Sequence, residues 1–124
     1  YAKIDRINQT RLRIQSREFQ ERLGGIVDGS QRILRAIEED PRDLRRARKF
    51  LNVYLDGIGK ISEQYVQTHR KSQTPVLEEN YRNLLVDMEN VCNEQYERLA
   101  QNDVFDLDVQ IEVLSTRLKR EGVV

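Results

Sequence analysis

The chain has 124 residues, of which 34% are charged and 38% are hydrophobic, and its formal net charge is zero. A chain of this length is expected to form one domain that buries about two-thirds of the unfolded surface. With only two prolines and six glycines, the composition excludes a loop-rich or all-β fold and favours long amphipathic helices.

The first predicted element is one long helix over residues 2 to 38. Its beginning is thinly apolar and strongly basic, so we assign residues 1 to 18 to a basic helical stalk and residues 19 to 124 to a helical bundle domain. Gly24 and Gly25 each cost about 1 kcal/mol relative to alanine in a helix interior. Because the apolar pattern keeps its phase across them, the sequence predicts a single helix that is weak at these glycines.

The second predicted helix, from Leu44 to about His69, has the clearest pattern in the chain. Asp40 can cap this helix and Pro41 fits its first position. A second apolar row widens the buried stripe, so more than one neighbouring helix is needed to cover it, and a bundle suits it better than a two-stranded coiled coil. The main row follows steps of three and four residues: Leu44, Ala47, Leu51, Tyr54, Ile58, Ile61 and Tyr65.

Two further helices are predicted. Thr74 and Pro75 repeat the combination of a cap and a proline and begin a helix that extends to about Gln101. Residues 106 to 122 combine strand-like alternation with helical spacing, but a single strand would have no partner, so we predict a helix. The predicted fold is therefore all-α: an antiparallel bundle of three long helices plus a short fourth C-terminal helix.

Residues that usually carry catalysis are scarce. The one histidine, His69, lies at a predicted helix end, where a solvated imidazole is well placed near the negative end of the dipole. The one cysteine, Cys92, lies on an apolar row and is interpreted as core filling in a reducing compartment. No phosphate-binding loop or nucleophile elbow motif occurs. We therefore expect no catalytic residue, no zinc site and no cofactor.

An acidic group near the last predicted helix is a candidate metal site. Its carboxylates could hold a divalent cation, although the glycine-bearing loop of the usual calcium site is missing. Asp106 and Asp108 also suit the start of a helix, and this capping role is the preferred interpretation. The group consists of Asp103, Asp106, Asp108 and Glu112.

Charge is divided unevenly along the chain. Residues 1 to 75 carry 16 Lys and Arg against 10 Asp and Glu, whereas residues 76 to 124 carry 5 against 11. Two interpretations stay open: the two parts neutralise each other in the fold, or the basic part also faces an anionic partner.

The most unusual basic group surrounds the first predicted hairpin, where several members lie near a helix start and are disfavoured by the dipole. They either pair with nearby carboxylates or bind phosphate, an acidic protein or lipid headgroups. Sequence-specific nucleic-acid binding is disfavoured because no aromatic residues alternate with these arginines. The candidate anion-binding residues are Arg32, Arg35, Arg42, Arg45, Arg46 and Lys49, and Arg48 belongs to the same group.

Two stretches together carry a distinctive pattern. The first is Asp40-Pro41-Arg42-Asp43 with Ala47-Arg48, Phe50-Leu51 and Tyr54-Leu55. The second is Phe105-Asp106-Leu107-Asp108-Val109 with Ile111-Glu112-Val113-Leu114 before Glu121-Gly122. Over most of residues 33 to 122, the chain resembles the XpaC family, named for a link to hydrolysis of the chromogenic substrate 5-bromo-4-chloroindolyl phosphate.

The resemblance implies a bacterial helical protein, often with hydrophobic segments ahead of the helical domain and often encoded beside tellurite resistance proteins. It implies a cytoplasmic location with a membrane tether upstream of Tyr1, in keeping with the Lys and Arg expected on that side. The basic stalk could then also bind anionic lipid. Self-association as a homo-oligomer stays open.

The family name implies phosphate ester hydrolysis, a slow reaction that normally needs metals or a covalent nucleophile. Our first hypothesis is a noncatalytic helical interaction module that binds a protein partner, such as a toxic-anion resistance protein, in toxic-anion or envelope stress resistance. The alternative is a weak phosphohydrolase acting on aryl phosphates, with the hairpin arginines as a phosphate clamp and the acidic group as metal ligands.

Overall fold

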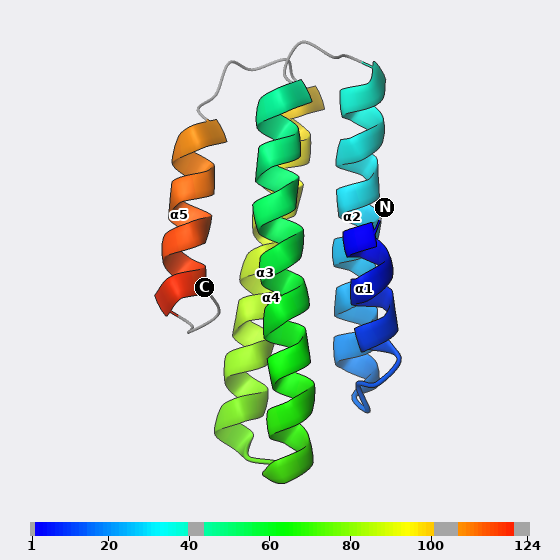
Figure 1. Cartoon of the computed structure of the whole chain (residues 1–124), viewed down its shortest axis with the longest axis vertical. Helices are drawn as coiled ribbons and strands as arrows, with labels where there is room; N and C mark the ends of the chain where they lie inside the picture. The colour runs from blue at the N-terminus through cyan, green and yellow to red at the C-terminus, as the bar shows by residue number, and fades with distance from the viewer. Residues whose placement is uncertain (1, 40–43, 101–106, 121–124) are drawn as a thin grey trace.

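The computed structural model describes residues 2–39, 44–100 and 107–120. The described residues form helices and no strand, which confirms the all-α prediction and the helical interpretation of the C-terminal segment. The helices are α1 (Ala2–Arg11), α2 (Arg17–Glu39), α3 (Leu44–Lys71), α4 (Pro75–Ala100) and α5 (Leu107–Arg120) (Figure 1).

The prediction of one continuous first helix is wrong, because the chain breaks between α1 and α2 and not at the glycines. The N–H of Arg13 donates to the carbonyl of Thr10 at 2.9 Å, which closes the last turn of α1. The N–H of Phe19 then donates to Ser16 Oγ at 3.3 Å, so Ser16 caps α2. Gly24 and its neighbour lie within an unbroken α2.

One glycine of α2 has a packing role. A Cβ atom added at Gly29 would lie 2.9 Å from Cys92 Sγ on α4. Real side chains do not approach this closely, so the missing side chain lets α2 and α4 pack tightly at this level. Gly29 therefore serves the packing of α2 against α4.

The basic N-terminal helix does not project from the bundle. α1 folds back along α2 and α3, and Ile7 is fully buried. Lys3 pairs with Asp56 of α3 at 2.5 Å, and Arg6 donates two hydrogen bonds to Glu63 at 2.7 and 2.8 Å. The expected projection is therefore wrong for these residues, while the division of the chain into domains stays a prediction.

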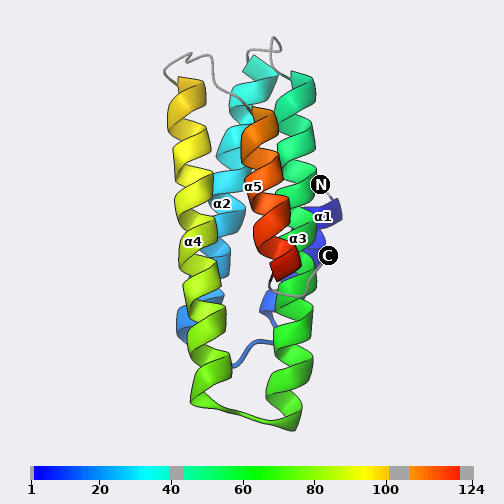
Figure 2. The ribbon, with the colours of Figure 1, turned by 90° about the vertical axis from the view of Figure 1, so that its left-hand side faces the viewer.

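The other helices are arranged around α3. α1 and α5 each pack along α3, and α2 packs along α4. Figure 2 shows α5 in front of the bundle between α3 and α4, but its backbone approaches α3 closely and α4 not at all. No helix in the described part of the chain combines the length and apolarity needed to cross a bilayer.

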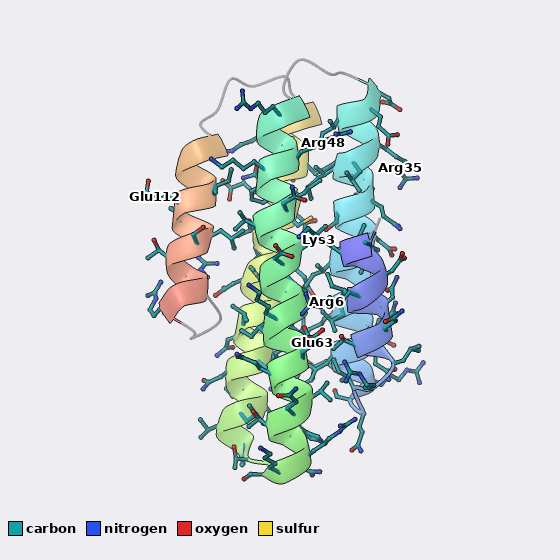
Figure 3. All side chains as sticks on the ribbon, in the orientation of Figure 1. Lys3, Arg6, Arg35, Arg48, Glu63 and Glu112 are labelled. Atoms are coloured by element: carbon teal, nitrogen blue, oxygen red, sulfur yellow. The ribbon has the colours of Figure 1, made fainter. Side chains whose placement is uncertain are left out.

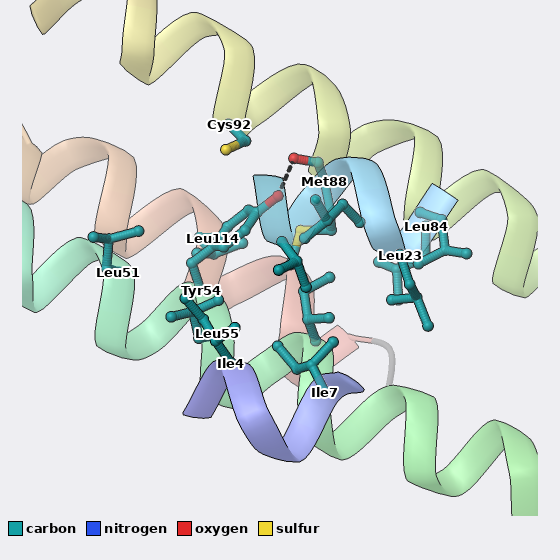
Figure 4. Packing of buried hydrophobic residues seen from close by; sticks show 14 of the residues in the cluster. Ile4, Ile7, Leu23, Leu51, Tyr54, Leu55, Leu84, Met88, Cys92 and Leu114 are labelled. Atoms are coloured by element: carbon teal, nitrogen blue, oxygen red, sulfur yellow. Dashed lines mark hydrogen bonds between the residues drawn. The ribbon is translucent and has the colours of Figure 1, made fainter. Parts of the chain in front are cut away.

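The predicted apolar rows of α3 form the centre of the core. Tyr54 and Ile58 are each 0% exposed, as the spacing predicted. Burying a large apolar side chain contributes about 1.5–3 kcal/mol, so this row is a main source of stability. The Tyr54 hydroxyl donates to the carbonyl oxygen of Met88 at 2.5 Å, so its polar atom is satisfied inside the core (Figure 4).

Candidate functional site

The acidic group predicted as an alternative metal site is only partly described. Asp103 and Asp106 lie outside the described residues, and so does the side chain of Asp108. Glu112 is exposed on α5 (Figure 3). Within the described residues, no three side chains of His, Cys, Asp or Glu converge in a way that could hold a metal ion. The metal site and the capping role therefore stay predictions.

The basic group gathers at the end of the bundle where α2 ends and α3 begins. Arg42 lies outside the described residues, and the side chain of Arg46 is not described. Of the others, Arg32 and Arg35 are exposed on the last turns of α2. Three more are exposed on the first turns of α3, namely Arg45, Arg48 and Lys49. We call these five described residues the basic end.

Most of the basic end has no charged partner among the residues that the structure describes. Among the described residues, no ion pair or hydrogen bond involves Arg35, Arg45, Arg48 or Lys49. The guanidinium of Arg32 instead lies 4.7 Å from the ring centre of Tyr96 on α4, a cation–π contact. Pairing with nearby carboxylates, the first of the two interpretations, is therefore not observed within the described part, and Asp40 and Asp43 lie outside it.

Elsewhere in the bundle, arginines form ion pairs that join neighbouring helices. Glu18 of α2 accepts hydrogen bonds from Arg82 of α4 at 2.8 and 3.0 Å and from Arg22 at 3.1 Å. These bonds, first from Arg82 and then from Arg22, lower the pKa of Glu18 to about 2. Arg22 also reaches Glu89 at 3.4 Å, so this network joins α2 to α4.

The histidine belongs to a second polar cluster, at the α3–α4 end. The Tyr65 hydroxyl donates to Glu78 Oε2 at 2.6 Å, and His69 Nδ1 lies 2.8 Å from Glu78 Oε1. Burial, followed by the bond to Glu78, raises the pKa of Tyr65. The His69 side chain is only 18% exposed, so the prediction of a solvated imidazole is wrong. We call Tyr65, His69 and Glu78 the hairpin clasp.

The prediction that Cys92 fills the core is confirmed, while the reducing compartment stays a prediction. Cys92 is 2% exposed and lies beside Tyr54 in the core (Figure 4). Burial raises the pKa of its thiol, which disfavours the nucleophilic thiolate. The side chain therefore fills space between helices.

The structure also shows a polar hollow that the sequence interpretation missed. It lies between α4 and α5, has a volume of about 360 Å³, and is lined by Asn80, Asn83, Leu84, Asp87, Arg117 and Arg120. The helical spacing of the polar residues on α4 was a usable signal, because it places them beside the buried Leu84. Guanidinium and amide N–H groups can donate to an anion, and the carboxylate of Asp87 can accept from a donor.

Comparisons with known proteins connect this arrangement to a family. No curated protein and no solved structure matches significantly. A family model described as "5-bromo-4-chloroindolyl phosphate hydrolysis protein" matches residues 1–114, which extends the similarity to the N-terminal helix. Since the match includes most of the chain, the protein belongs to the XpaC family of 5-bromo-4-chloroindolyl phosphate hydrolysis proteins.

Proposed function

We propose that this chain is a noncatalytic helical interaction module and that its basic end binds an acidic surface of a protein partner. The observation that supports this proposal is the cationic charge at the basic end, which has no ion-pair partner among the described residues. The ion pairs that join α1 to α3 and α2 to α4 lie elsewhere.

The helix dipole strengthens this argument. Arg45 lies in the first turn of α3, where the dipole disfavours positive charge, and Arg48 and Lys49 lie in the second turn, where this effect is weaker. Arg70 and Lys71 lie in the last turn of the same helix, where the dipole favours it. An acidic partner would relieve the unfavourable charge at the first end, and complementary charge would also speed the encounter.

A charge reversal with a matched control tests the proposal. In a pulldown from the native host, we expect the parent chain to retain a partner whose capture weakens with salt. The variant Arg45→Glu/Lys49→Glu should lose this partner, whereas Arg70→Glu/Lys71→Glu on the same helix should keep it. Equal capture by both variants would contradict the proposal.

The remaining parts of the proposal rest on the family. A role in toxic-anion or envelope stress resistance predicts that the partner is a resistance protein. A membrane tether upstream of Tyr1 and a cytoplasmic location predict that the full reading frame encodes apolar spans and that the protein fractionates with membranes. A protein with neither property would contradict the tether.

The family description favours a second candidate, a weak aryl phosphatase. In this function the basic residues would clamp the phosphate, and the acidic group that includes Glu112 would hold a metal ion. The test is release of indolyl product by highly purified protein with magnesium, manganese or zinc. Activity no greater than that of a mock preparation would remove this candidate.

A further inference from the structure

The hollow between α4 and α5 is lined by basic and acidic side chains that form no ion pair with each other. The backbone of α5 lies close to α3 and farther from α4, which leaves space between the side chains of α4 and α5 (Figure 2). The hollow of about 360 Å³ lies there, with the 4% exposed Leu84 among its lining residues. Its size is at the small end of ligand sites, which are about 300–1,000 Å³.

One wall of the hollow supplies donors for an anion. Arg117 and Arg120 are three residues apart on α5, so they share a face of that helix. They lie near its C-terminal end, where the dipole stabilises positive charge. A guanidinium can donate two parallel hydrogen bonds to a carboxylate. On α4, Asn80 and Asn83 add amide groups that donate and accept.

The other wall carries a negative charge. Asp87 lines the same hollow, yet among the described side chains it forms no ion pair with Arg117 or Arg120 and no hydrogen bond. A simple anion would leave Asp87 without a partner, and a simple cation would leave the two arginines without one. A ligand that carries both charges would satisfy both walls.

We propose that the α4–α5 hollow binds a small zwitterion, a free α-amino acid. Its carboxylate contacts Arg117 and Arg120, and its ammonium group contacts Asp87. The amides of Asn80 and Asn83 complete the hydrogen bonds. This site lies apart from the basic end, so it adds small-molecule binding to the proposed partner binding and does not depend on it.

An NMR titration of the whole chain tests the site. Each standard amino acid is added to the ¹⁵N-labelled protein, with acetate and methylamine as probes that carry only one of the two charges. We expect at least one amino acid to give saturable shifts at residues lining the hollow. Acetate and methylamine should each bind at least about tenfold more weakly, a difference of about 1.4 kcal/mol.

Variants assign the two charges. Arg117→Gln/Arg120→Gln should abolish binding, whereas Asp87→Asn should remove the preference for the amino acid over acetate. Arg70→Gln/Lys71→Gln, at the end of α3, is the matched control and should bind like the parent. Circular dichroism confirms that each variant remains helical.

Three results would overturn the proposal. They are the absence of saturable shifts with every amino acid, unchanged binding in Arg117→Gln/Arg120→Gln, and tighter binding of inorganic phosphate than of any amino acid at the same residues. Equal partner capture by the two charge-reversal variants would contradict the proposed function but would leave this titration unchanged, so the two proposals fail separately.

Discussion

The two ends of the bundle reached by α3 carry similar sequence signals, Asp40-Pro41 and Thr74-Pro75, but hold charge differently. Thr74 caps α4, because its Oγ1 accepts a hydrogen bond from the N–H of Leu77 at 3.1 Å, whereas Asp40 and Pro41 lie outside the described residues. At the α3–α4 end, Tyr65 and His69 bond to Glu78 across the hairpin. At the other end, the described basic residues form no ion pair with described residues. Hairpin signals in the sequence therefore predict topology, whereas the electrostatic role of each end depends on contacts between helices.

The largest expected effect on stability is at the clasped end. Phe19 meets Tyr65 and Tyr81 edge to face, with ring centres 5.5 and 5.0 Å apart. Phe19→Ala should lower the free energy of unfolding by about 3–5 kcal/mol, because it removes a buried ring and leaves a cavity. Lys49→Ala at the basic end should change it by less than about 0.5 kcal/mol. Urea denaturation measures both, and similar losses would refute the contrast.

The next largest loss of stability is expected when the hairpin clasp is removed. Glu78→Ala removes the acceptor of the Tyr65 hydroxyl and the partner of His69, which leaves these two groups of low exposure only their own long contact at 3.4 Å. We expect a loss of about 1–3 kcal/mol in urea denaturation. The neighbouring Glu79→Ala, whose carboxylate is exposed and pairs only with Arg82, is the matched control and should lose less than about 1 kcal/mol. If the hairpin clasp does not stabilise the fold, Glu78→Ala and Glu79→Ala will lose the same free energy of unfolding.

How far the sequence predicted these regions depends on the range of the interactions. The α3 row was predictable because its spacing is a local property, and Tyr54 lies in the core as expected. The break before Ser16 was missed because no glycine or proline marks it, and because the cap depends on a hydrogen bond from the N–H of Phe19 to Ser16 Oγ. The contact of His69 with Glu78 was missed because it joins the end of one helix to the start of the next.

The basic end and the α4–α5 hollow differ in the same way: the first depends on residues close in sequence, and the second on contacts between helices. The basic end was visible because its residues are close in sequence, on either side of a predicted hairpin. To predict the α4–α5 hollow, one would need to know that α5 packs closely along α3 and lies farther from α4. Arg117 and Asp87 line the same space only because of that arrangement. The sequence predicted that each residue lies on a helix, but it did not predict that these two helices lie side by side.

A pH titration tests whether the ion pairs between α2 and α4 stabilise the fold. The pKa of Glu18 is lowered from 4.5 to about 2 in the folded protein. The folded state therefore binds this proton more weakly than the unfolded state, so its contribution is complete above pH 4.5 and is lost as the pH falls toward about 2. Thermal unfolding of Glu18→Gln should depend less on pH in this window than that of the parent. An unchanged pH dependence would show that the network contributes nothing.

The smallest expected change is at the basic end, and its sign is informative. Arg45 lies in the first turn of α3, so Arg45→Glu replaces a charge that the dipole disfavours with one that it favours. We expect the free energy of unfolding to rise by about 0.3–1 kcal/mol at low ionic strength and the gain to shrink with salt. Lys71→Glu, at the other end of the helix, should lower it by a similar amount. If Arg45→Glu stabilises the fold while the basic-end reversal abolishes partner capture, this charge serves binding at a cost to stability. A loss of stability in Arg45→Glu would instead show that Arg45 supports the fold.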